Sequence, residues 1–276
     1  MSRAEVAGLR AVVFDWAGTL FDFGSLAPTG AFVELFARHG VTISVAEARV
    51  PMGLPKREHI QAIGRLPRVS AAWRACHGRD LDDGDVDTLF AEYGPMNAAA
   101  VAAHATLVPG ALDTVAALRA KGIRVGSTTG YDRHIMNVAL PLIAEQGLHV
   151  DCLVCADDVA TSRPSPLALY RCLLDLGVWP MHRVVKVDDT VPGLLEGRNA
   201  GCWTVAVAAS GNEVGLSLDD WRSLDEADRQ QCLARAHRRL SEAQPDHIVA
   251  SVATLMPAVA EIEARLARGE CPRPTP

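Results

Sequence analysis

Residues 11–22 read AVVFDWAGTLFD, an apolar run that stops on Asp15 and continues through Gly18 and Thr19. A short apolar run bounded in this way predicts a buried strand. Because open parallel sheets bind ligands beyond the carboxyl ends of their strands, Asp15 is a candidate nucleophile facing a crevice. A lone aspartate after a strand is more often a turn or cap residue, so this assignment depends on further segments. Two positions later stands Ala17, whose methyl group cannot donate a proton to a leaving group.

The chain beyond residue 105 alternates between two patterns. Apolar runs of strand type occur at 123–129, 152–156, 184–187, 203–208 and 248–252, and helical patterns separate the earlier ones at 110–121, 132–146, 166–176 and 191–199. Strands that alternate with helices predict an α/β fold with a doubly wound parallel sheet and right-handed crossovers. A charged helical stretch is expected over 218–240, and a last helix over 254–266.

One interval breaks this alternation. Between residues 25 and 104 only helical patterns occur, at 29–39, 45–50, 56–63, 68–77 and 85–103. We therefore expect a core domain formed by residues 1–24 and 105–276, with a small all-helical cap domain, residues 25–104, inserted after the first strand. The expected role of such an insertion is a mobile lid over the crevice. The alternative is a helical bundle that only widens the core.

Composition excludes several classes of protein. The 276 residues are 49% hydrophobic and carry a net charge of -6, which argues against a nucleic-acid binder because such proteins rely on clustered cations. No apolar run approaches the ~18 residues of a membrane span. The first ten residues lack the apolar segment of a signal peptide. We expect a cytoplasmic protein with a small-molecule substrate.

Cysteine usage supports the same compartment. The seven cysteines are odd in number and scattered, which favours reduced thiols over a disulfide framework. Cys152 and Cys155 form a C-x-x-C inside the apolar run DCLVCAD, with no matching Cys or His pair nearby. We interpret them as small residues of a buried strand rather than as a metal or redox site.

Three later segments supply groups that suit a phosphorylated ligand. The run GSTTGYDR brings a strand to Thr128, Thr129 and Gly130, whose hydroxyls and amides can bind phosphate oxygens at a helix start. The run TSRPSP holds Arg163 in a proline-stiffened loop, where a guanidinium can neutralise phosphate charge. Each signal is weak alone, since Ser and Thr also cap helices and most arginines are solvated.

The third segment, RVVKVDDT, ends a strand on Asp188 and Asp189. Paired acids at a strand end are costly unless a cation compensates them, and Mg²⁺ prefers carboxylate and phosphate oxygens. A carboxylate such as Asp15 could approach a phosphoryl anion only if a metal screens the repulsion. The order and spacing of the four segments therefore predict a magnesium-dependent site at the carboxyl edge of the sheet.

These four segments match the four motifs of the haloacid dehalogenase (HAD) superfamily. Within it, DWAGT, PMGLPKREHI, GSTTGYDR, SRPSP and KVDDTVPGLLEGRNAG closely resemble the phosphonoacetaldehyde hydrolase (phosphonatase) family, and the resemblance covers nearly the whole chain. It implies a HAD-like Rossmannoid core with a helical cap. It also implies Mg²⁺-dependent cleavage of the carbon-phosphorus bond of phosphonoacetaldehyde to acetaldehyde and phosphate, in the degradation of 2-aminoethylphosphonate.

The resemblance assigns the catalytic residues. Lys56 matches the lysine that forms a Schiff base with the aldehyde, and Asp15 the nucleophile that becomes an aspartyl-phosphate. An iminium at Lys56 is an electron sink for the departing carbon, so no acid is needed at Ala17. A low pKa of Lys56 would help condensation, and nearby cations such as Arg57 or the metal would lower it. His59, one turn further on, matches a position placed to shuttle protons.

The resemblance also assigns binding groups. Mg²⁺ would be held by Asp15, the backbone carbonyl of Ala17 and Asp189, although Asp188, where some members have Gly, is an alternative ligand. Superfamily members often carry another acid near Pro192 and Gly193, and Asp188 could supply its charge. Thr129 and Gly130 would bind the phosphoryl group, and Arg163 would balance its charge. Met52 and Tyr131 would lie beside the Schiff base. A homodimer formed through the cap helices is implied as well.

Two other functions use parts of the same pattern. A small-molecule phosphatase, phosphomutase or haloacid dehalogenase would share the core, but Ala17 argues against the first two and the paired acids against the third. A non-catalytic binder of a phosphorylated ligand would need only Thr129 and Arg163. It would leave Asp15 and Lys56 without a role.

Overall fold

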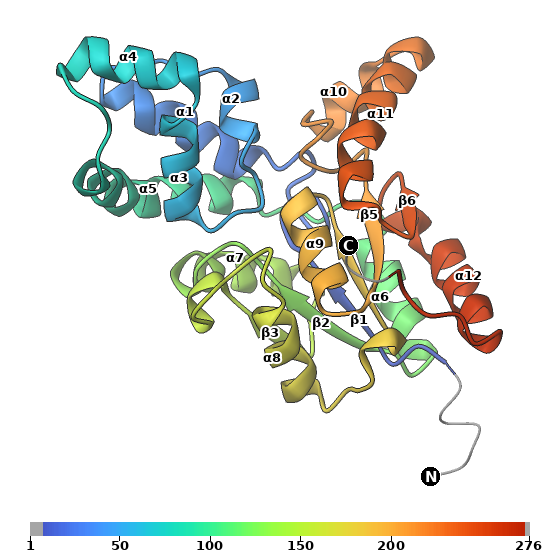
Figure 1. Ribbon diagram of the computed structural model, residues 1–276. Coiled ribbons are helices and arrows are strands. Elements are labelled where there is room, and N and C mark those ends of the chain that lie inside the picture. The colour runs from blue at the N-terminus through green and yellow to red at the C-terminus, as the bar shows by residue number, and fades with distance from the viewer. Residues whose placement is uncertain (1–7, 274–276) are drawn as a thin grey trace.

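The computed structural model describes residues 8–273 and is built on a six-stranded parallel sheet (Figure 1). The strands are β1 (Ala11–Phe14), β2 (Arg124–Thr128), β3 (Cys152–Val154), β4 (Val184–Asp188), β5 (Trp203–Val207) and β6 (His247–Val249). Their order is β3-β2-β1-β4-β5-β6, which confirms the predicted doubly wound sheet. Because β1 lies between β2 and β4, the winding reverses direction beside β1. Ligands of such sheets bind at this reversal.

Helices cover both faces of the sheet because the strand residues alternate in direction. Val12 and Phe14 belong to the core under α6 (Ala111–Ala120), α7 (Arg133–Glu145) and α12 (Leu255–Ala267). Ala11 and Val13 pack instead with α8 (Leu167–Leu176), and the same face carries α9 (Val191–Asn199) and α11 (Glu226–Leu240).

The charged stretch at 218–240 forms two helices rather than one. The first, α10 (Leu218–Ser223), ends at Leu224, whose ψ of 144° is extended. Asp225 then begins α11, because its side chain accepts a hydrogen bond from the backbone N–H of Asp228. The cap that Asp225 provides stabilises the start of α11, so α10 ends instead of continuing.

The inserted segment is entirely helical, as predicted. It forms α1 (Leu26–Arg38), α2 (Val45–Arg49), α3 (Lys56–Gly64), α4 (Pro67–His77) and α5 (Asp83–His104). These helices gather beside the sheet (Figure 1) around a hydrophobic cluster of their own that includes Phe32, Phe36 and Trp73. We call α1–α5 the helical cap. Its separate cluster argues against a bundle that only widens the core, while the role of a mobile lid and the domain boundaries stay predictions.

The segment that leads from β1 into the cap is closely held. Asp22 has a φ of 54°, and its carboxylate accepts hydrogen bonds from the backbone N–H groups of Leu26 and Ala27, at 3.0 Å each. This carboxylate caps α1, since Ser25 at the N-cap position makes no side-chain cap bond. The backbone N–H of Asp22 also bonds the carbonyl of Thr106 on the returning segment, so the two connections to the cap lie together.

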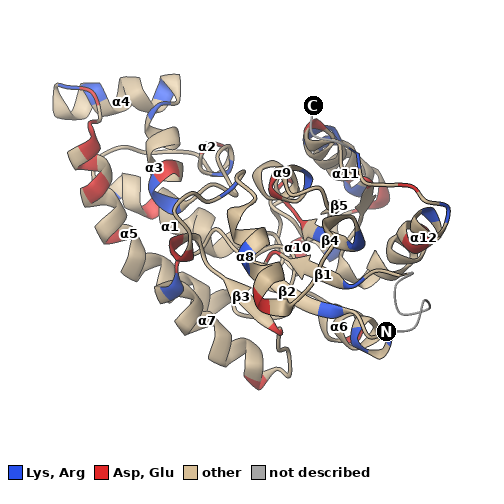
Figure 2. Ribbon diagram, turned by 60° about the horizontal axis from the view of Figure 1, so that its bottom comes forward, with Lys and Arg blue, Asp and Glu red and all other residues tan. Residues whose placement is uncertain are grey.

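The surface carries both signs of charge. Figure 2 shows basic and acidic residues interspersed along the outer helices. None of the helices formed by residues 8–273 is long and apolar enough to span a membrane. All seven cysteines are free thiols, and Cys155 is buried in the sheet core. Residues 1–7, most of the stretch considered above for a signal peptide, lie outside the described residues.

Candidate active site

The carboxyl ends of β1, β2 and β4 meet the cap at one cavity of about 30 Å³. That volume has room for only a few water-sized molecules in this arrangement of cap and sheet. Nine of the residues predicted from the sequence line it: Asp15, Ala17, Met52, Lys56, Thr129, Gly130, Tyr131, Arg163 and Asp189. Three predicted residues do not: Thr128, Asp188 and His59.

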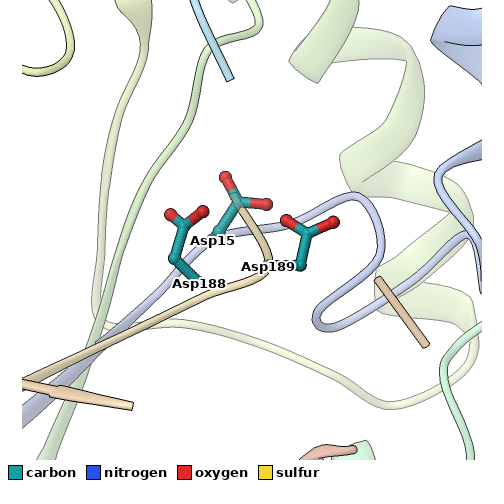
Figure 3. A group of neighbouring side chains, drawn as sticks. All are labelled: Asp15, Asp188 and Asp189. Atoms are coloured by element: carbon teal, nitrogen blue, oxygen red, sulfur yellow. The ribbon is translucent and has the colours of Figure 1, made fainter. Parts of the chain in front are cut away.

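Three carboxylates lie side by side where β1 and β4 end (Figure 3), and two of them, Asp15 and Asp189, line the cavity. Asp15, Asp188 and Asp189 are all buried, and one oxygen of each lies within 4.8 Å of the others. Burial and the charge of Asp188 raise the pKa of Asp15 to about 6, against the opposing effect of Arg163. Burial, Asp15 and Asp188 raise the pKa of Asp189 well above its ordinary value. The cluster is therefore short of positive charge.

Asp188 and Asp189 face different surroundings. Asp188 accepts hydrogen bonds from the N–H and hydroxyl of Thr190, at 3.0 and 2.8 Å, and lies 3.2 Å from the ammonium of Lys186. Burial favours its protonated form, but Arg163 and Lys186 outweigh burial and hold its pKa below the ordinary value. Asp189 lines the cavity, and its Oδ1 has no hydrogen-bond partner. Oδ2 of Asp188 accepts no hydrogen bond from the described residues either, but it lies 3.2 and 3.3 Å from Lys186 and Arg163, so Asp189 is the acid of the pair with an oxygen open to the cavity.

Arg163 contacts the candidate nucleophile. One of its terminal nitrogens, Nη2, lies 2.8 Å from Oδ1 of Asp15 and donates at 2.7 Å to the backbone carbonyl of Thr128. It also lies 3.3 Å from Asp188 and, through Nε, 3.3 Å from Glu196. Burial would lower the pKa of Arg163, but the surrounding carboxylates raise it above its ordinary value. The buried guanidinium is therefore a permanent cation.

A second buried cation lies behind Arg163. Lys186, in the middle of β4, is fully buried, and its ammonium lies 3.2 Å from Glu196 of α9 and donates at 2.6 Å to the hydroxyl of Thr128. That hydroxyl in turn donates at 2.8 Å to Glu196. The side chain of Thr128 is therefore held in this network and does not line the cavity, and its predicted contact to the substrate stays a prediction.

The charges beneath the cavity do not balance. With every group ionised, Arg163 and Lys186 face an excess of two negative charges from four carboxylates, Asp15, Asp188, Asp189 and Glu196. Protonated Lys56, across the cavity, would remove one of them. A divalent cation between Asp15 and Asp189 would remove both, and its hard oxygen ligands are of the type that Mg²⁺ prefers. The unpartnered Oδ1 of Asp189 fits the same ion.

Lys56 reaches the cavity from the cap. It is the first residue of α3, is 8% exposed, and its ammonium lies 5.0 Å from the ring centre of Tyr131 and 5.7 Å from that of Phe32. Burial is the main cause that lowers its pKa to about 8, and Arg163 adds to it while Asp15 opposes it. The start of a helix also disfavours a cation. With this pKa, roughly a tenth of Lys56 is free amine at pH 7, far more than for an ordinary lysine.

Arg57 does not act on Lys56 as expected. Its guanidinium turns to the surface and donates at 2.7 Å to Asp87. Proximity in sequence does not bring the two cations together, because neighbouring residues on a helix point about 100° apart. The cation that lowers the pKa of Lys56 comes from the sheet side of the cavity, in Arg163.

His59 lies behind Lys56 rather than in the cavity wall. The ring is fully buried, stacks on Phe32 with ring centres 4.0 Å apart, and its Nε2 lies 2.8 Å from the carbonyl of Ala48. Burial, followed by the charge of Lys56, lowers its pKa well below the ordinary value. A neutral ring must then carry its proton on Nε2, which leaves Nδ1 as an acceptor without a partner.

The cap loop before α3 forms part of the cavity wall. Gly53 has a φ of 93°, and a β carbon there would lie 2.5 Å from the hydroxyl oxygen of Thr190. A β carbon at Gly130 would lie 3.4 Å from the carbonyl oxygen of Leu54. Gly53 thus lets the cap loop pack directly on the sheet edge, whereas a β carbon at Gly130 would make only an ordinary contact. Met52 and Tyr131, both buried, complete the wall on either side of this contact.

Several contributors were not predicted from the sequence. Lys186 and Glu196 were missed, although a lysine inside the apolar strand VVKVD signals a buried cation that needs a partner. The cavity is also lined by Ser25, Pro28, Gly53 and Thr190. No local pattern marks these four, because they come together only when the cap closes on the sheet.

Comparison with known proteins identifies what the fold and site resemble. Residues 9–201 match the family model described as haloacid dehalogenase-like hydrolase. A phosphonoacetaldehyde hydrolase of Paraburkholderia xenovorans is 47% identical over 96% of this chain and 99% of its own length. The corresponding protein of Vibrio cholerae is 43% identical over 96% of this chain and 98% of its own.

A solved structure shows the same architecture. The crystal structure of a phosphonoacetaldehyde hydrolase-like protein from Oleispira antarctica superposes with a TM-score of 0.95 at 41% identity, and the match covers 96% of this chain and 97% of that one. The match includes the helical cap as well as the sheet, since it spans nearly all of both chains.

Proposed function

Because the chain belongs to the haloacid dehalogenase-like hydrolases, in the phosphonoacetaldehyde hydrolase family, we propose that it cleaves the carbon-phosphorus bond of phosphonoacetaldehyde through Lys56 and Asp15. The observation that carries this mechanism is the cavity that both side chains line, one from the cap and one from the sheet. Ala17 lines the same cavity and offers no acid. The leaving carbon must therefore be stabilised from the cap.

Lys56 carries out the first step. Its neutral amine attacks the aldehyde carbon, and loss of water gives a protonated imine. Burial of Lys56 supports this step because it lowers the pKa to about 8 and so supplies free amine. The rings of Phe32 and Tyr131 beside the ammonium can contact the resulting cation.

Asp15 then attacks phosphorus. The carbon-phosphorus bond breaks, its electron pair moves into the iminium to give an enamine on Lys56, and an aspartyl-phosphate remains on Asp15. Water hydrolyses the aspartyl-phosphate to phosphate. Protonation of the enamine and hydrolysis of the imine then release acetaldehyde and restore Lys56, so the cycle consumes one water in all.

Charge control falls to the surrounding groups. Arg163, 2.8 Å from Asp15, is placed to bind the phosphoryl oxygens, together with the Thr129 hydroxyl and the Gly130 amide. When bound by Asp15, Asp189 and the Ala17 carbonyl, Mg²⁺ would screen the carboxylate from the phosphonate anion. The excess of negative charge and the free Oδ1 of Asp189 support this assignment.

His59 is proposed as the proton acceptor of the imine steps. Its neutral ring and its unpartnered Nδ1 support this role, and it lies one turn from Lys56 on α3. Met52 and Tyr131 are proposed to hold the two-carbon part of the substrate. We also propose that the reaction belongs to the degradation of 2-aminoethylphosphonate and takes place in the cytoplasm.

The protein is further proposed to form a homodimer through the cap helices. Light scattering on protein eluting from a size-exclusion column measures the mass and tests the dimer.

The proposal is tested by following both products. Purified protein is given phosphonoacetaldehyde with Mg²⁺ or with EDTA, and acetaldehyde and phosphate are measured in parallel. Equal release of the two with Mg²⁺ is expected, and sugar phosphates and haloacids serve as competing substrates. Turnover of a sugar phosphate or haloacid without acetaldehyde from the phosphonate would favour the alternative enzymes.

The Schiff base is tested separately. Borohydride added with substrate should fix a two-carbon label on Lys56, identified by peptide mass, and Lys56→Arg should abolish both label and acetaldehyde. Label on another lysine would refute the assignment of Lys56. Substantial turnover by Asp15→Ala would remove Asp15 as the nucleophile.

A further inference from the structure

Arg49, the last residue of α2 in the cap, reaches across to the sheet side of the molecule. Its Nη1 donates to the carbonyl of Gly24 at 2.9 Å and to the carbonyl and side-chain oxygen of Asn212 at 3.1 and 2.9 Å. Its Nη2 donates to the carbonyl of Gly215 at 3.2 Å. One cap residue thus bonds the connection to the cap at Gly24 and the loop that follows β5.

The loop is shaped to receive this side chain. We call residues 210–216 the latch loop. Gly215 has a φ of 68°, and a β carbon there would lie 2.6 Å from the central carbon of the Arg49 guanidinium. Gly24 has a φ of 90°, and a β carbon there would lie 2.1 Å from the carbonyl oxygen of Leu216. The N–H of Gly24 also donates to the carbonyl of Ser210 at 2.7 Å. The guanidinium therefore lies against Gly215, in the space that a side chain there would need, and we call this position the seat of Arg49.

The same loop holds the candidate metal ligand. The backbone N–H of Asn212 donates at 2.7 Å to Oδ2 of Asp189, and a β carbon at Gly211 would lie 2.6 Å from that of Asp189. Asn212 accepts from the cap through two oxygens and donates to Asp189 through its nitrogen. The orientation of Asp189 is thus joined to the position of the cap by one residue.

We propose that Arg49 is a positioning residue that couples closure of the cap to the arrangement of Asp189 for metal binding. With the cap closed, Arg49 fixes Asn212, and Asn212 holds Oδ2 of Asp189 so that Oδ1 faces the cavity. With the cap open, the guanidinium leaves its seat, and the latch loop loses three hydrogen bonds while Gly24 loses a fourth. This inference rests on the proposed function only for the identity of the metal.

The test compares Arg49→Met with Arg68→Met. Arg68 is a matched control because it is also a cap arginine, but its partners within residues 8–273 are Glu47 and the carbonyl of Thr42, both at the surface. Calorimetric titration with Mg²⁺ alone, without substrate, is expected to show about tenfold weaker binding for Arg49→Met and a change below twofold for Arg68→Met. Equal affinities in the wild type and Arg49→Met would overturn the proposal.

Hydrogen exchange gives a second readout. Amides of the latch loop and of residues 22–25 are expected to exchange faster in Arg49→Met than in the wild type, with no change in Arg68→Met. Millimolar guanidinium should restore Mg²⁺ affinity to Arg49→Ala if the seat persists. Faster exchange over the whole chain, without rescue, would show general destabilisation and overturn the positioning role.

A milder variant covers the case in which Arg49→Met does not fold. Asn212→Ala removes one acceptor of Arg49 but keeps the N–H that holds Asp189, so a two- to threefold loss of Mg²⁺ affinity is expected. Adding Asn212→Ala to Arg49→Met should cause no further loss of Mg²⁺ affinity, since both substitutions remove the hydrogen bond from Arg49 to the side chain of Asn212. Additive losses would contradict the coupling. Both readouts need no substrate, so they remain valid if the protein does not hydrolyse phosphonoacetaldehyde.

Discussion

The carboxylate of Asp188 occupies the space where a side chain at Gly193 would lie. A β carbon at Gly193 would be 2.0 Å from Oδ2 of Asp188. The carboxylate that follows β4 therefore fills the space in which a side chain on the first turn of α9 would lie. The sequence shows no acid at Pro192 or Gly193, and the expectation was that Asp188 could supply that charge. The structure places the Asp188 carboxylate against that position, in support of this interpretation.

The first prediction concerns this shared volume. Alanine is normally favoured over glycine inside a helix by about 0.5–1 kcal/mol, and Gly30→Ala in α1, with nothing within 4 Å, should show that gain. Gly193→Ala should instead destabilise the protein by about 1–3 kcal/mol, since the added carbon displaces a bonded carboxylate. Chemical denaturation of both variants measures the difference. A gain of stability in Gly193→Ala would show that Asp188 moves aside at little cost.

The second prediction concerns pH. Because the pKa of Lys56 is lowered to about 8, its neutral fraction increases with pH up to that value and then levels off. The value of kcat/KM should therefore increase about tenfold per pH unit below pH 7 and become constant above pH 8 to 9. Rates measured across pH 6–10 at saturating Mg²⁺ check this. A midpoint near the ordinary lysine value would show that burial does not tune the amine.

The third prediction separates two roles of His59. His59→Gln keeps a donor that can reach the carbonyl of Ala48, where Nε2 now lies at 2.8 Å, but it cannot accept and release a proton. If His59 shuttles protons, this variant should keep its thermal stability and lose at least tenfold in kcat. His59→Ala serves as the comparison for lost packing against Phe32. Wild-type kcat in His59→Gln would limit His59 to a structural role.

The fourth prediction concerns the fully buried pair of Lys186 and Glu196. Glu196→Gln leaves the ammonium of Lys186 with Asp188, 3.2 Å away, as its remaining carboxylate partner, and should cost about 1–3 kcal/mol of stability. The double variant with Lys186→Met should be less destabilised than the sum of the two single variants, because the pair is 3.2 Å apart. Urea unfolding of the four proteins gives the coupling. Simple additivity would show that each side chain acts through other partners.

The sequence determined the framework of this protein. Apolar runs and helical periodicity are local signals, so all six strands and the helical insertion could be predicted from them. Parallel strands also end at a common edge, and for this reason Asp15, Thr129 and Asp189, which each follow a strand, could be placed at one site. The family resemblance added Lys56, which no local pattern distinguishes from a solvated lysine.

Only the tertiary structure decided which of two adjacent residues faces the cavity. Successive strand residues point to opposite faces, so Asp189 and Thr129 line the cavity while Asp188 and Thr128 turn to Lys186 and Glu196. The phase of that alternation depends on the packing of α9 against β4. The low pKa of Lys56 and the seat of Arg49 likewise depend on contacts between the cap and the sheet. Residues far apart in sequence make those contacts, and no single segment encodes them.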